Sequence, residues 1–515
     1  MTPRSGVRLV EVLGAMSLAV DLGIGQPMGH VARSCLLAQR LGAVVGLPDD
    51  QRKHLFHVTL MGWLGCIADS HDAAAWFGDD IDYRAGVYDV DMRPLPFLGY
   101  LLRRVAPDEP AVRRVSRGAQ LVATGARAVQ NSLRAHCQVT EQVARRLALP
   151  EDVCVALRQV FARWDGQGLP KKLRGEDLAM TIRLWQIADV ADVHHGRGGV
   201  PAAMAVVRRR RGTQFDPSLV DVFCARAEDL FAEVTDDPDT NWDDVVAAEP
   251  GLAHQLTEDE LDNALEAVAD WVDLKSPYFT GHCGAVAQLA AASAKHLGLG
   301  EDDVRLVRRA GLLHDLGRIG VPNTIWDKTA PLTVVELERI RLHSYYTERM
   351  LARPQPLAAI GAIAGAAHER LDGSGYHRGR SAAELPTLAR ILAAAECYQT
   401  SIEDRPHRPA TRPTTAAENL RGEAAAGRLD PTAVSAVLTT AGQRPSRPPT
   451  WTAGLTAREV EVLALLAKGH TNRQIGRTLG ISPKTAGNHI EHIYTKAGVN
   501  TRAAATLFAM EHGLA

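Results

Sequence analysis

The stretch AGLLHDLGRIGVP, residues 310–322, places a histidine beside an aspartate in an apolar segment that ends in a Gly/Pro loop. An ionised carboxylate in apolar surroundings is costly unless a cation or a metal pairs with it. The pair His314-Asp315 could therefore bind a metal ion or a structural partner. The dipeptide alone does not decide, since a chain of this length contains about one by chance, and this chain has a second, His71-Asp72.

The segments around His314-Asp315 occur twice in the chain. GHVARSCLLAQRLGAVVGLPDD, from Gly29, resembles GHCGAVAQLAAASAKHLGLGED, from Gly281, at an offset of 252 residues that continues into TLMGWLG over GLLHDLG. A second block, with RWDGQG over RLDGSG, aligns at an offset of 207. The difference between the two offsets, 45 residues, is extra chain in the first copy between Gly65 and His136. These fixed spacings indicate two copies of one helical domain.

The two copies differ at the positions that could bind a metal. In the second copy the candidate ligands lie on separate predicted helices that a bundle could bring together: His282, His314, Asp315, His343, His368 and Glu396. In the first copy Gly62-Trp63 replaces the His-Asp pair and Phe161 replaces His368, whereas three candidates are retained, namely His30, His136 and Asp189. We therefore predict that the first copy binds no metal and has a structural or regulatory role.

Composition narrows the class of protein. A chain of 515 residues is long enough for about three or four domains, and its net charge of −2 gives no overall attraction to nucleic acid or membrane. Seven scattered cysteines without a C-x-x-C motif fit reduced thiols rather than a disulfide framework or a zinc knuckle. No apolar run approaches the length that crosses a membrane. The sequence predicts a soluble, cytoplasmic protein without a membrane partner.

Apolar residues spaced three and four apart predict an all-α chain of five parts. Residues 232–275 contain fourteen Asp and Glu against one Lys, and AGQRPSRPPTWT, residues 441–452, is rich in proline. We expect an extended linker at the proline-rich stretch. The predicted parts are a degenerate first copy at 1–235, an acidic connector at 236–257, the second copy at 258–440, the linker at 441–452 and a C-terminal domain at 453–515.

The ordered motifs of the second copy are TGH, LLHDLGRIGVPNTIWDK, RLHSYYTERML, HERLDGSGYH and DRPHRPA. In this order they resemble the HD superfamily of metal phosphohydrolases, in its HD-GYP branch. The resemblance covers residues 258–440 well and residues 10–235 weakly. It implies all-α bundles that bind two or three metal ions, often iron or manganese, and hydrolyse cyclic di-GMP.

The resemblance also implies roles for individual residues. One metal would be bound by His282, His314, Asp315 and Glu396, and a second by Asp315, His343 and His368. Arg318, where the family usually has Lys, would act beside Asp315 in catalysis by neutralising a phosphate oxygen. Imidazole and carboxylate ligands suit first-row divalent metals such as iron or manganese. A shared aspartate can bridge two ions about 3.5–4 Å apart, so one or two ions are expected.

Three positions depart from the family pattern. Ala367 precedes His368 where the family usually has two adjacent histidines, which removes a ligand of the second metal. Glu396 replaces an aspartate, and His377 replaces the proline of the GYP motif. Hydrolysis and sensing without hydrolysis therefore both stay open.

The C-terminal domain shows clear helix starts. Thr456-x-x-Glu459 and Thr471-x-x-Gln474 are capping boxes, and Ser482-Pro483 combines an N-cap with proline at the first helical position. Only LGIS separates the second and third helices, which is typical of a helix-turn-helix. Residues 455–514 are similar to the LuxR-type helix-turn-helix along their whole length, in LTAREVEVLALLAKG, NRQIGRTLGISPKT and NHIEHIYTKAGV.

This similarity implies a four-helix domain whose recognition helix enters the major groove of double-stranded DNA. Lys484 and Thr485 would contact phosphates, Asn488 and Glu491 would face bases, and Arg473 and Lys496 would anchor the backbone. Ala486-Gly487 departs from the usual Val-Lys, so one contact is missing. The expected core residues are Ile475, Leu479, Ile481, Ile490 and Ile493, and the last helix would offer a dimer contact through Leu507, Phe508 and Met510.

Taken together, these motifs predict two HD-type helical bundles followed by a LuxR-type domain. Our main hypothesis is a homodimeric transcription regulator whose second bundle binds metal and senses or hydrolyses a phosphorylated ligand such as a cyclic nucleotide. The alternative is an active phosphodiesterase of the cyclic di-GMP type with a DNA-binding tail. A third class, a protein-docking scaffold, would show neither metal binding nor salt-dependent DNA binding.

Overall fold

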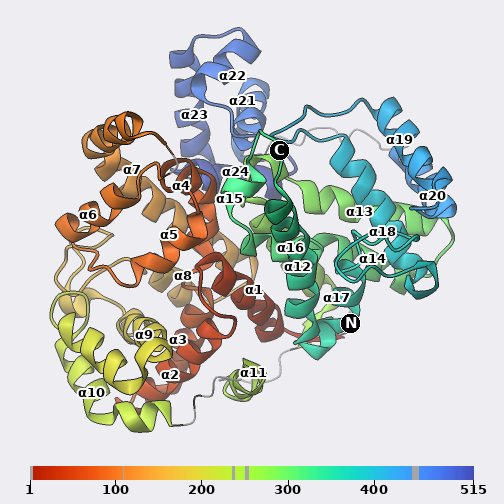
Figure 1. The fold of residues 1–515 in the computed structure, drawn as a ribbon. Helices are drawn as coiled ribbons and strands as arrows, with labels where there is room; N and C mark the ends of the chain where they lie inside the picture. The colour runs from red at the N-terminus through yellow and green to blue at the C-terminus, as the bar shows by residue number, and fades with distance from the viewer. Residues whose placement is uncertain (1–3, 108, 233, 235–237, 250–254, 443–451) are drawn as a thin grey trace. The chain divides into compact units, whose positions relative to one another are not determined.

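The computed structural model describes residues 4–107, 109–232, 234, 238–249, 255–442 and 452–515. The chain divides into two compact units, Pro3–Thr257 and Glu258–Ala515. In the part of the chain described, the structure has 24 α-helices, and its only sheet pairs β1 (Arg4–Arg8) with β2 (Gln255–Thr257) in antiparallel fashion (Figure 1). The prediction of an all-α fold is therefore confirmed.

The first unit is a helical bundle with an additional group of helices. Its helices are α1 (Leu9–Gly23), α2 (His30–Val44), α3 (Asp49–Met61), α4 (Ser70–Phe77), α5 (Asp80–Val87), α6 (Pro94–Arg104), α7 (Ala111–Arg146), α8 (Glu151–Leu157), α9 (Met180–Arg209), α10 (Pro217–Phe231) and α11 (Pro238–Ala247). The helices α2, α3 and α9 pack against one another, and the 3-10 turn Leu64–Asp69 packs against α7.

The second unit begins with a bundle of nine helices within its described residues. They are α12 (Glu258–Asp273), α13 (His282–His296), α14 (Glu301–Leu313), α15 (Asn323–Trp326), α16 (Val334–Ala352), α17 (Ala358–Ala364), α18 (Thr387–Ser401), α19 (Pro413–Ala425) and α20 (Pro431–Gly442). The helix α13 packs against α14, α18 and α20 (Figure 1). The predicted linker falls mostly on residues 443–451, which lie outside the described residues.

The two bundles match element by element. The helices α2 and α13 each have 15 residues, α3 and α14 each have 13, and α8 and α17 each have seven. The first two pairs start at the predicted offset of 252 and the third at 207. The internal repeat is therefore a repeat of structure as well as of sequence, which confirms two HD-type bundles.

The extra residues of the first copy form α4, α5, α6 and the N-terminal part of α7. Their side chains build an apolar cluster of their own around Phe97, Tyr100, Leu101 and Leu121. A cluster of this kind buries enough apolar surface to stabilise a local group of helices. The insertion is thus a packed addition to the bundle.

The C-terminal domain contains α21 (Ala457–Ala467), α22 (Asn472–Leu479), α23 (Pro483–Ala497) and α24 (Arg502–Glu511). All three predicted N-caps accept a backbone N–H from the third helical residue: Thr456, Thr471 and Ser482. Between α22 and α23, Gly480 takes φ +66°, a left-handed conformation that favours glycine. This conformation of Gly480 allows the short turn of the helix-turn-helix between α22 and α23.

The core of this domain agrees with the predicted residues in most respects. Buried core residues include Ile475, Ile490 and Ile493, and the partly buried Leu479 and Ile481 pack against them. The prediction of a dimer contact is wrong for Leu507 and Phe508. These two residues are buried within the unit, at 0% and 8% exposure, because α24 packs back onto α21. Met510 is partly exposed, and its role in a dimer stays a prediction.

None of the helices in the described ranges is long and apolar enough to cross a membrane.

Candidate metal centre

Five elements of the second unit supply the predicted metal ligands. His282 begins α13, His314 and Asp315 follow the end of α14, and His343 lies on α16. The two remaining ligands are His368, in the turn after α17, and Glu396, on α18. All of these side chains are buried except that of His368, which is partly exposed.

A buried aspartate fixes the start of the helix that carries His282. The backbone N–H of Cys283 donates to Asp273 at 3.1 Å, and Gly281 takes φ +75°, which turns the chain into α13. The first copy repeats this arrangement, since Asp21 accepts the N–H of Val31 at 3.0 Å. This acceptor therefore sets the position of the first histidine in both bundles.

The ring orientations of His314 and His343 are fixed by backbone carbonyls. His314 donates from Nδ1 to Gly311 O at 2.8 Å, and His343 donates from Nδ1 to Ile340 O at 2.5 Å. A histidine that donates from Nδ1 has Nε2 free to bind a metal, and metal-bound histidines are commonly held in this way. Both rings are therefore oriented as ligands.

Four of the predicted ligands converge at one point. His282 Nε2 lies 3.1 Å from Glu396 Oε2 and 3.4 Å from Asp315 Oδ2, while His314 Nε2 lies 3.5 Å and 3.1 Å from the same two oxygens. An ion about 2.1 Å from each ligand requires ligand atoms about 3.0–3.4 Å apart. All four of these atoms are buried without a hydrogen-bond partner, so they fit a metal ion.

The other oxygen of Asp315 belongs to a second cluster. His343 Nε2 lies 3.4 Å from Asp315 Oδ1, and these two residues and His368 offer ligand atoms within 4.8 Å of one another. Burial lowers the pKa of both His343 and His368, which favours the neutral imidazoles that bind metals. Burial would also lower the pKa of His282 and His314, but the carboxylates beside them raise it. One carboxylate therefore connects two potential metal sites.

Arg318 lies directly beside the shared aspartate. Its Nη2 contacts Asp315 Oδ2, its guanidinium carbon is 3.6 Å from the centroid of the Phe279 ring, and Nε and Nη1 have no partner. Burial alone would raise the pKa of Asp315, but the charges of Arg318 and His314 hold that pKa well below its usual range. The aspartate is thus ionised, and the arginine retains two buried donors that could bind an anion.

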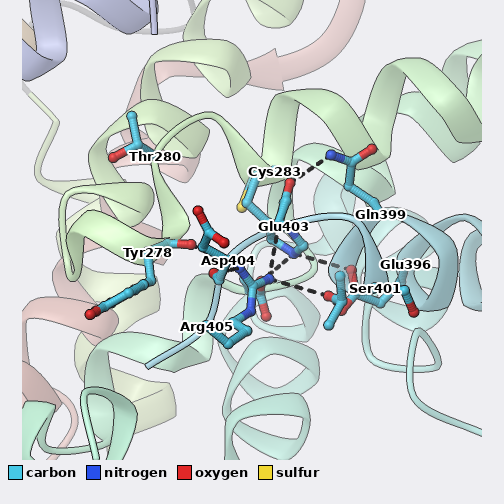
Figure 2. A network of polar contacts seen from close by, with 12 residues as sticks. Tyr278, Thr280, Cys283, Glu396, Gln399, Ser401, Glu403, Asp404 and Arg405 are labelled. Carbon is cyan, nitrogen blue, oxygen red and sulfur yellow. Dashed lines mark hydrogen bonds and ion pairs between the residues drawn. The ribbon is translucent and has the colours of Figure 1, made fainter. Parts of the chain in front are cut away.

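A second layer of side chains, which no sequence motif indicated, orients His282. His282 Nδ1 lies 2.7 Å from Glu403 Oε2. Glu403 also accepts hydrogen bonds from Gln399 and from Arg405 (Figure 2), at 2.6 and 2.9 Å respectively. Arg405 in turn donates to the carbonyl oxygen of Tyr278 at 2.8 Å. Burial would raise the pKa of Glu403, but His282 and Arg405 hold it at about 2.

The same layer reaches the fourth ligand. Thr400 Oγ1 donates to Glu396 Oε1 at 2.7 Å and accepts from Arg405 Nη2 at 3.3 Å. Glu403 follows Glu396 by seven residues, lies just beyond the end of α18 at Ser401, and directly precedes the DRPHRPA motif. Its place beside that motif was the available clue to its role at the site.

Two of the departures from the family pattern can now be located. Ala367 is buried at 1% exposure and offers no ligand atom. His377 Nε2 lies 3.0 Å from Glu348, whose carboxylate also pairs with Arg378 and Arg380. His377 therefore faces an ion-pair cluster and is absent from both ligand groups.

The corresponding position in the first copy is occupied by hydrogen-bonded side chains. Trp63 Nε1 donates to Asp189 Oδ1 at 2.7 Å, and Tyr88 donates to the same oxygen at 3.2 Å. His30 binds Asp189 through Nε2 and Asp192 through Nδ1, at 3.1 and 2.7 Å. Within the described ranges the groups able to bind a metal lie in the second unit, and the absence of metal from the first copy stays a prediction.

All six predicted DNA contacts are exposed on α22 and α23, namely Arg473, Lys484, Thr485, Asn488, Glu491 and Lys496. The side chain of Lys496, which is 34% exposed, donates to Glu459 at 2.7 Å. Burial would raise the pKa of Glu459, but hydrogen bonds from Lys496 and the Thr456 backbone hold it at about 2. Lys496 thus connects α23 to the first turn of α21.

Two segments of the chain match known protein families. Residues 266–433 match the HD domain, and residues 453–509 match the bacterial regulatory proteins of the luxR family. The 3'3'-cGAMP-specific phosphodiesterase 3 of Vibrio cholerae is 29% identical over 78% of this chain and 88% of its own length. The cyclic di-GMP phosphodiesterase of Thermotoga maritima is 36% identical over 25% of this chain and 35% of its own length.

A solved structure agrees with the fold. The crystal structure of a cyclic GMP-AMP specific phosphodiesterase of V. cholerae superposes with a TM-score of 0.59 at 24% identity, covering 85% of this chain and 98% of that one. At this identity the likeness shows the fold alone. The chain therefore contains an HD domain and a C-terminal domain of the luxR family, and it is similar to proteins named as cyclic-nucleotide phosphodiesterases.

Proposed function

We propose that this chain is a transcription regulator whose HD domain binds divalent metal ions and a phosphorylated ligand of the cyclic-nucleotide class. One observation carries the proposal. Buried imidazole nitrogens and carboxylate oxygens without hydrogen-bond partners converge on both oxygens of Asp315. Leaving such atoms unpaired in a folded protein is costly, so they are best explained as ligands of metal ions.

The donor set favours particular metals. Every candidate ligand is an imidazole nitrogen or a carboxylate oxygen, which suits iron or manganese better than a thiolate-preferring metal. One ion would be bound by His282, His314, Asp315 and Glu396, and a second by Asp315, His343 and His368. When bound, such ions polarise phosphodiester oxygens and activate water.

The chain itself supplies charge and orientation to this site. Arg318 presents buried N–H groups next to Asp315, where a phosphate oxygen of a ligand would find a charge-assisted hydrogen bond. Glu403 and the carbonyl oxygens of Gly311 and Ile340 hold three imidazoles in fixed orientations. These residues thus prepare a site for an anion beside the metals.

The class of ligand is taken from the relatives. Proteins that resemble this chain are named as phosphodiesterases specific for 3'3'-cGAMP or cyclic di-GMP. Both molecules are cyclic dinucleotides with phosphodiester groups. We propose that a cyclic dinucleotide binds at the HD domain and that its binding alters the DNA affinity of a homodimer.

Hydrolysis of the ligand is the second candidate function. The presence of six candidate ligands and of a cation, Arg318, beside Asp315 favours hydrolysis. The apolar Ala367, buried where the family usually has a histidine, favours sensing without turnover. Incubation of the metal-loaded chain with cyclic di-GMP and 3'3'-cGAMP separates the two, since only an enzyme releases a linear product.

Metal binding is tested by the variant Asp315→Asn. Because Asp315 offers an oxygen to both ligand groups, we expect the full chain to retain about one or two iron or manganese ions and the variant to retain almost none. Metal content after desalting, measured by inductively coupled plasma mass spectrometry, gives the result. The matched control is Asp72→Asn, in the second, exposed His-Asp dipeptide of the chain.

Equal metal content in Asp315→Asn and in the unchanged chain would contradict the proposed site. So would an unchanged chain that retains no metal under anaerobic loading.

The role of Glu403 is tested by Glu403→Gln. The amide keeps the shape of the side chain but removes the charge that orients His282, so we expect a loss of metal affinity of about 10- to 100-fold. Competition with a fluorescent chelator measures this affinity. The control is Asp404→Asn, at the exposed neighbouring position, which should bind metal like the unchanged chain. Equal affinities of Glu403→Gln and the control would show that the hydrogen bond to His282 contributes nothing.

DNA binding is tested by Lys484→Ala on α23. A lysine that contacts one phosphate releases about one counterion, so the slope of log affinity against log salt concentration should fall by about 1. Fluorescence anisotropy with a labelled random-sequence duplex measures that slope. Lys295→Ala, at an exposed position of the HD domain, should leave the slope unchanged. Identical slopes for the two variants would exclude Lys484 from the DNA interface.

A further inference from the structure

The first unit contains a cavity of about 520 Å³. Its wall includes Trp63, His136, Phe161 and Asp189, which correspond in the repeat to Asp315, His343, His368 and Glu396 of the metal centre. The first copy thus has a cavity at the position that corresponds to the metal site, and other side chains line it. The volume lies within the range of about 300–1,000 Å³ that is typical of small-molecule sites.

The inserted helices supply an apolar wall. Phe97, Leu101, Leu121 and Val129 line the cavity, and the same residues take part in the apolar cluster of the insertion. Another part of the wall contains aromatic rings, among them Trp63, whose centroid lies 5.4 Å from that of Trp185. Most of the wall is therefore suited to an apolar body.

One buried cation in the wall, Arg210, forms no direct ion pair, although the nearby carboxylates of Asp91 and Asp89 raise its pKa. Arg210 is 3% exposed, and it donates to carbonyl oxygens of Tyr88 and Val90 and to the Gln214 side chain, while its Nε has no partner. No carboxylate of the described residues forms an ion pair with it. Burial and the charge of Arg209 lower its pKa to about 10, so it remains a cation at neutral pH.

A second arginine in the same wall shows the contrast. Arg163 is also buried, but Asp91 and Asp165 pair with it at 3.2 and 3.0 Å. A buried guanidinium without a carboxylate is costly, whereas one that meets an anionic ligand is stabilised. Arg210 is therefore a buried cation in this wall that an anion would satisfy.

We propose that the cavity of the first unit binds a small amphipathic organic acid, with its carboxylate on Arg210 and its apolar body between the aromatic wall and the inserted helices. This site is separate from the metal centre, and the proposal does not depend on the function of the HD domain. It gives the degenerate copy a binding function in place of metal chemistry.

The test uses the full chain and two carboxylate probes, decanoate and 1-naphthoate, each compared with its neutral alcohol, 1-decanol or 1-naphthalenemethanol. Equilibrium dialysis with radiolabelled probes measures binding. We expect saturable binding of about one molecule per chain by at least one carboxylate, about tenfold tighter than by its alcohol because of the charge-assisted hydrogen bond. Absence of saturable binding by both carboxylates would overturn the proposal, as would equal affinity for each acid and its alcohol.

Two variants locate the binding site. Arg210→Met should reduce the affinity for the acid to that for the alcohol, whereas Arg209→Met, at the exposed neighbouring position, should leave it unchanged. Val129→Trp should abolish binding by filling the cavity, and Val115→Trp, at a position on α7 that is 74% exposed, should not. Circular dichroism checks that each variant is folded. Unchanged binding in a folded Val129→Trp would place the acid elsewhere and overturn the proposal.

Discussion

The second unit is organised around a single buried carboxylate, that of Asp315. Its side chain is fully buried, and one guanidinium and three imidazoles lie within ion-pair distance of its two oxygens. In a low-dielectric interior an ionised aspartate is stable only among such partners. These partners come from different segments, since His282 begins α13, His314 follows the end of α14 and His343 lies on α16. The carboxylate of Asp315 therefore joins three segments of the unit.

The repeat shows what happens when this carboxylate is replaced. In the first copy Trp63 stands at the equivalent position, and its indole N–H satisfies Asp189, the counterpart of Glu396. His30 keeps its place at the start of α2, but both of its nitrogens are bound by aspartates. The same helical bundle therefore holds candidate ligand atoms without hydrogen-bond partners in the second copy. In the first copy it holds aromatic side chains that donate hydrogen bonds to Asp189. Three positions differ, with Gly62, Trp63 and Phe161 in place of His314, Asp315 and His368. These exchanges, together with an inserted group of helices, account for the difference.

Much of this could be predicted from the sequence because the residues carry regular spacing. The offsets of 252 and 207 located both bundles, and the capping residues Thr456, Thr471 and Ser482 located three helix starts. The network behind the ligands could not be predicted in the same way. Gln399, Glu403 and Arg405 meet only because the chain turns back after α18, and a sequence pattern does not encode that turn.

Other features could not be predicted because they depend on packing between segments that are far apart in the sequence. Leu507 and Phe508 suggested a dimer contact, but α24 buries them within the unit. Lys496 suggested a DNA anchor, yet the fold brings Glu459 within 2.7 Å of it, so its role in DNA binding stays a prediction. The cavity of the first unit depends on how inserted helices pack against a degenerate site. Its wall combines residues of α6, α7 and α9 that no local pattern relates.

X-ray absorption at the metal edge of the iron- or manganese-loaded full chain tests the central claim most directly. If Asp315 joins two metal sites, the spectrum will show nitrogen and oxygen ligands, the outer-shell scattering of imidazole rings and a metal–metal distance of about 3.5–4 Å. A single ion with imidazole ligands would limit the claim to the first group of ligands. A spectrum of oxygen ligands alone, without imidazole scattering, would contradict it.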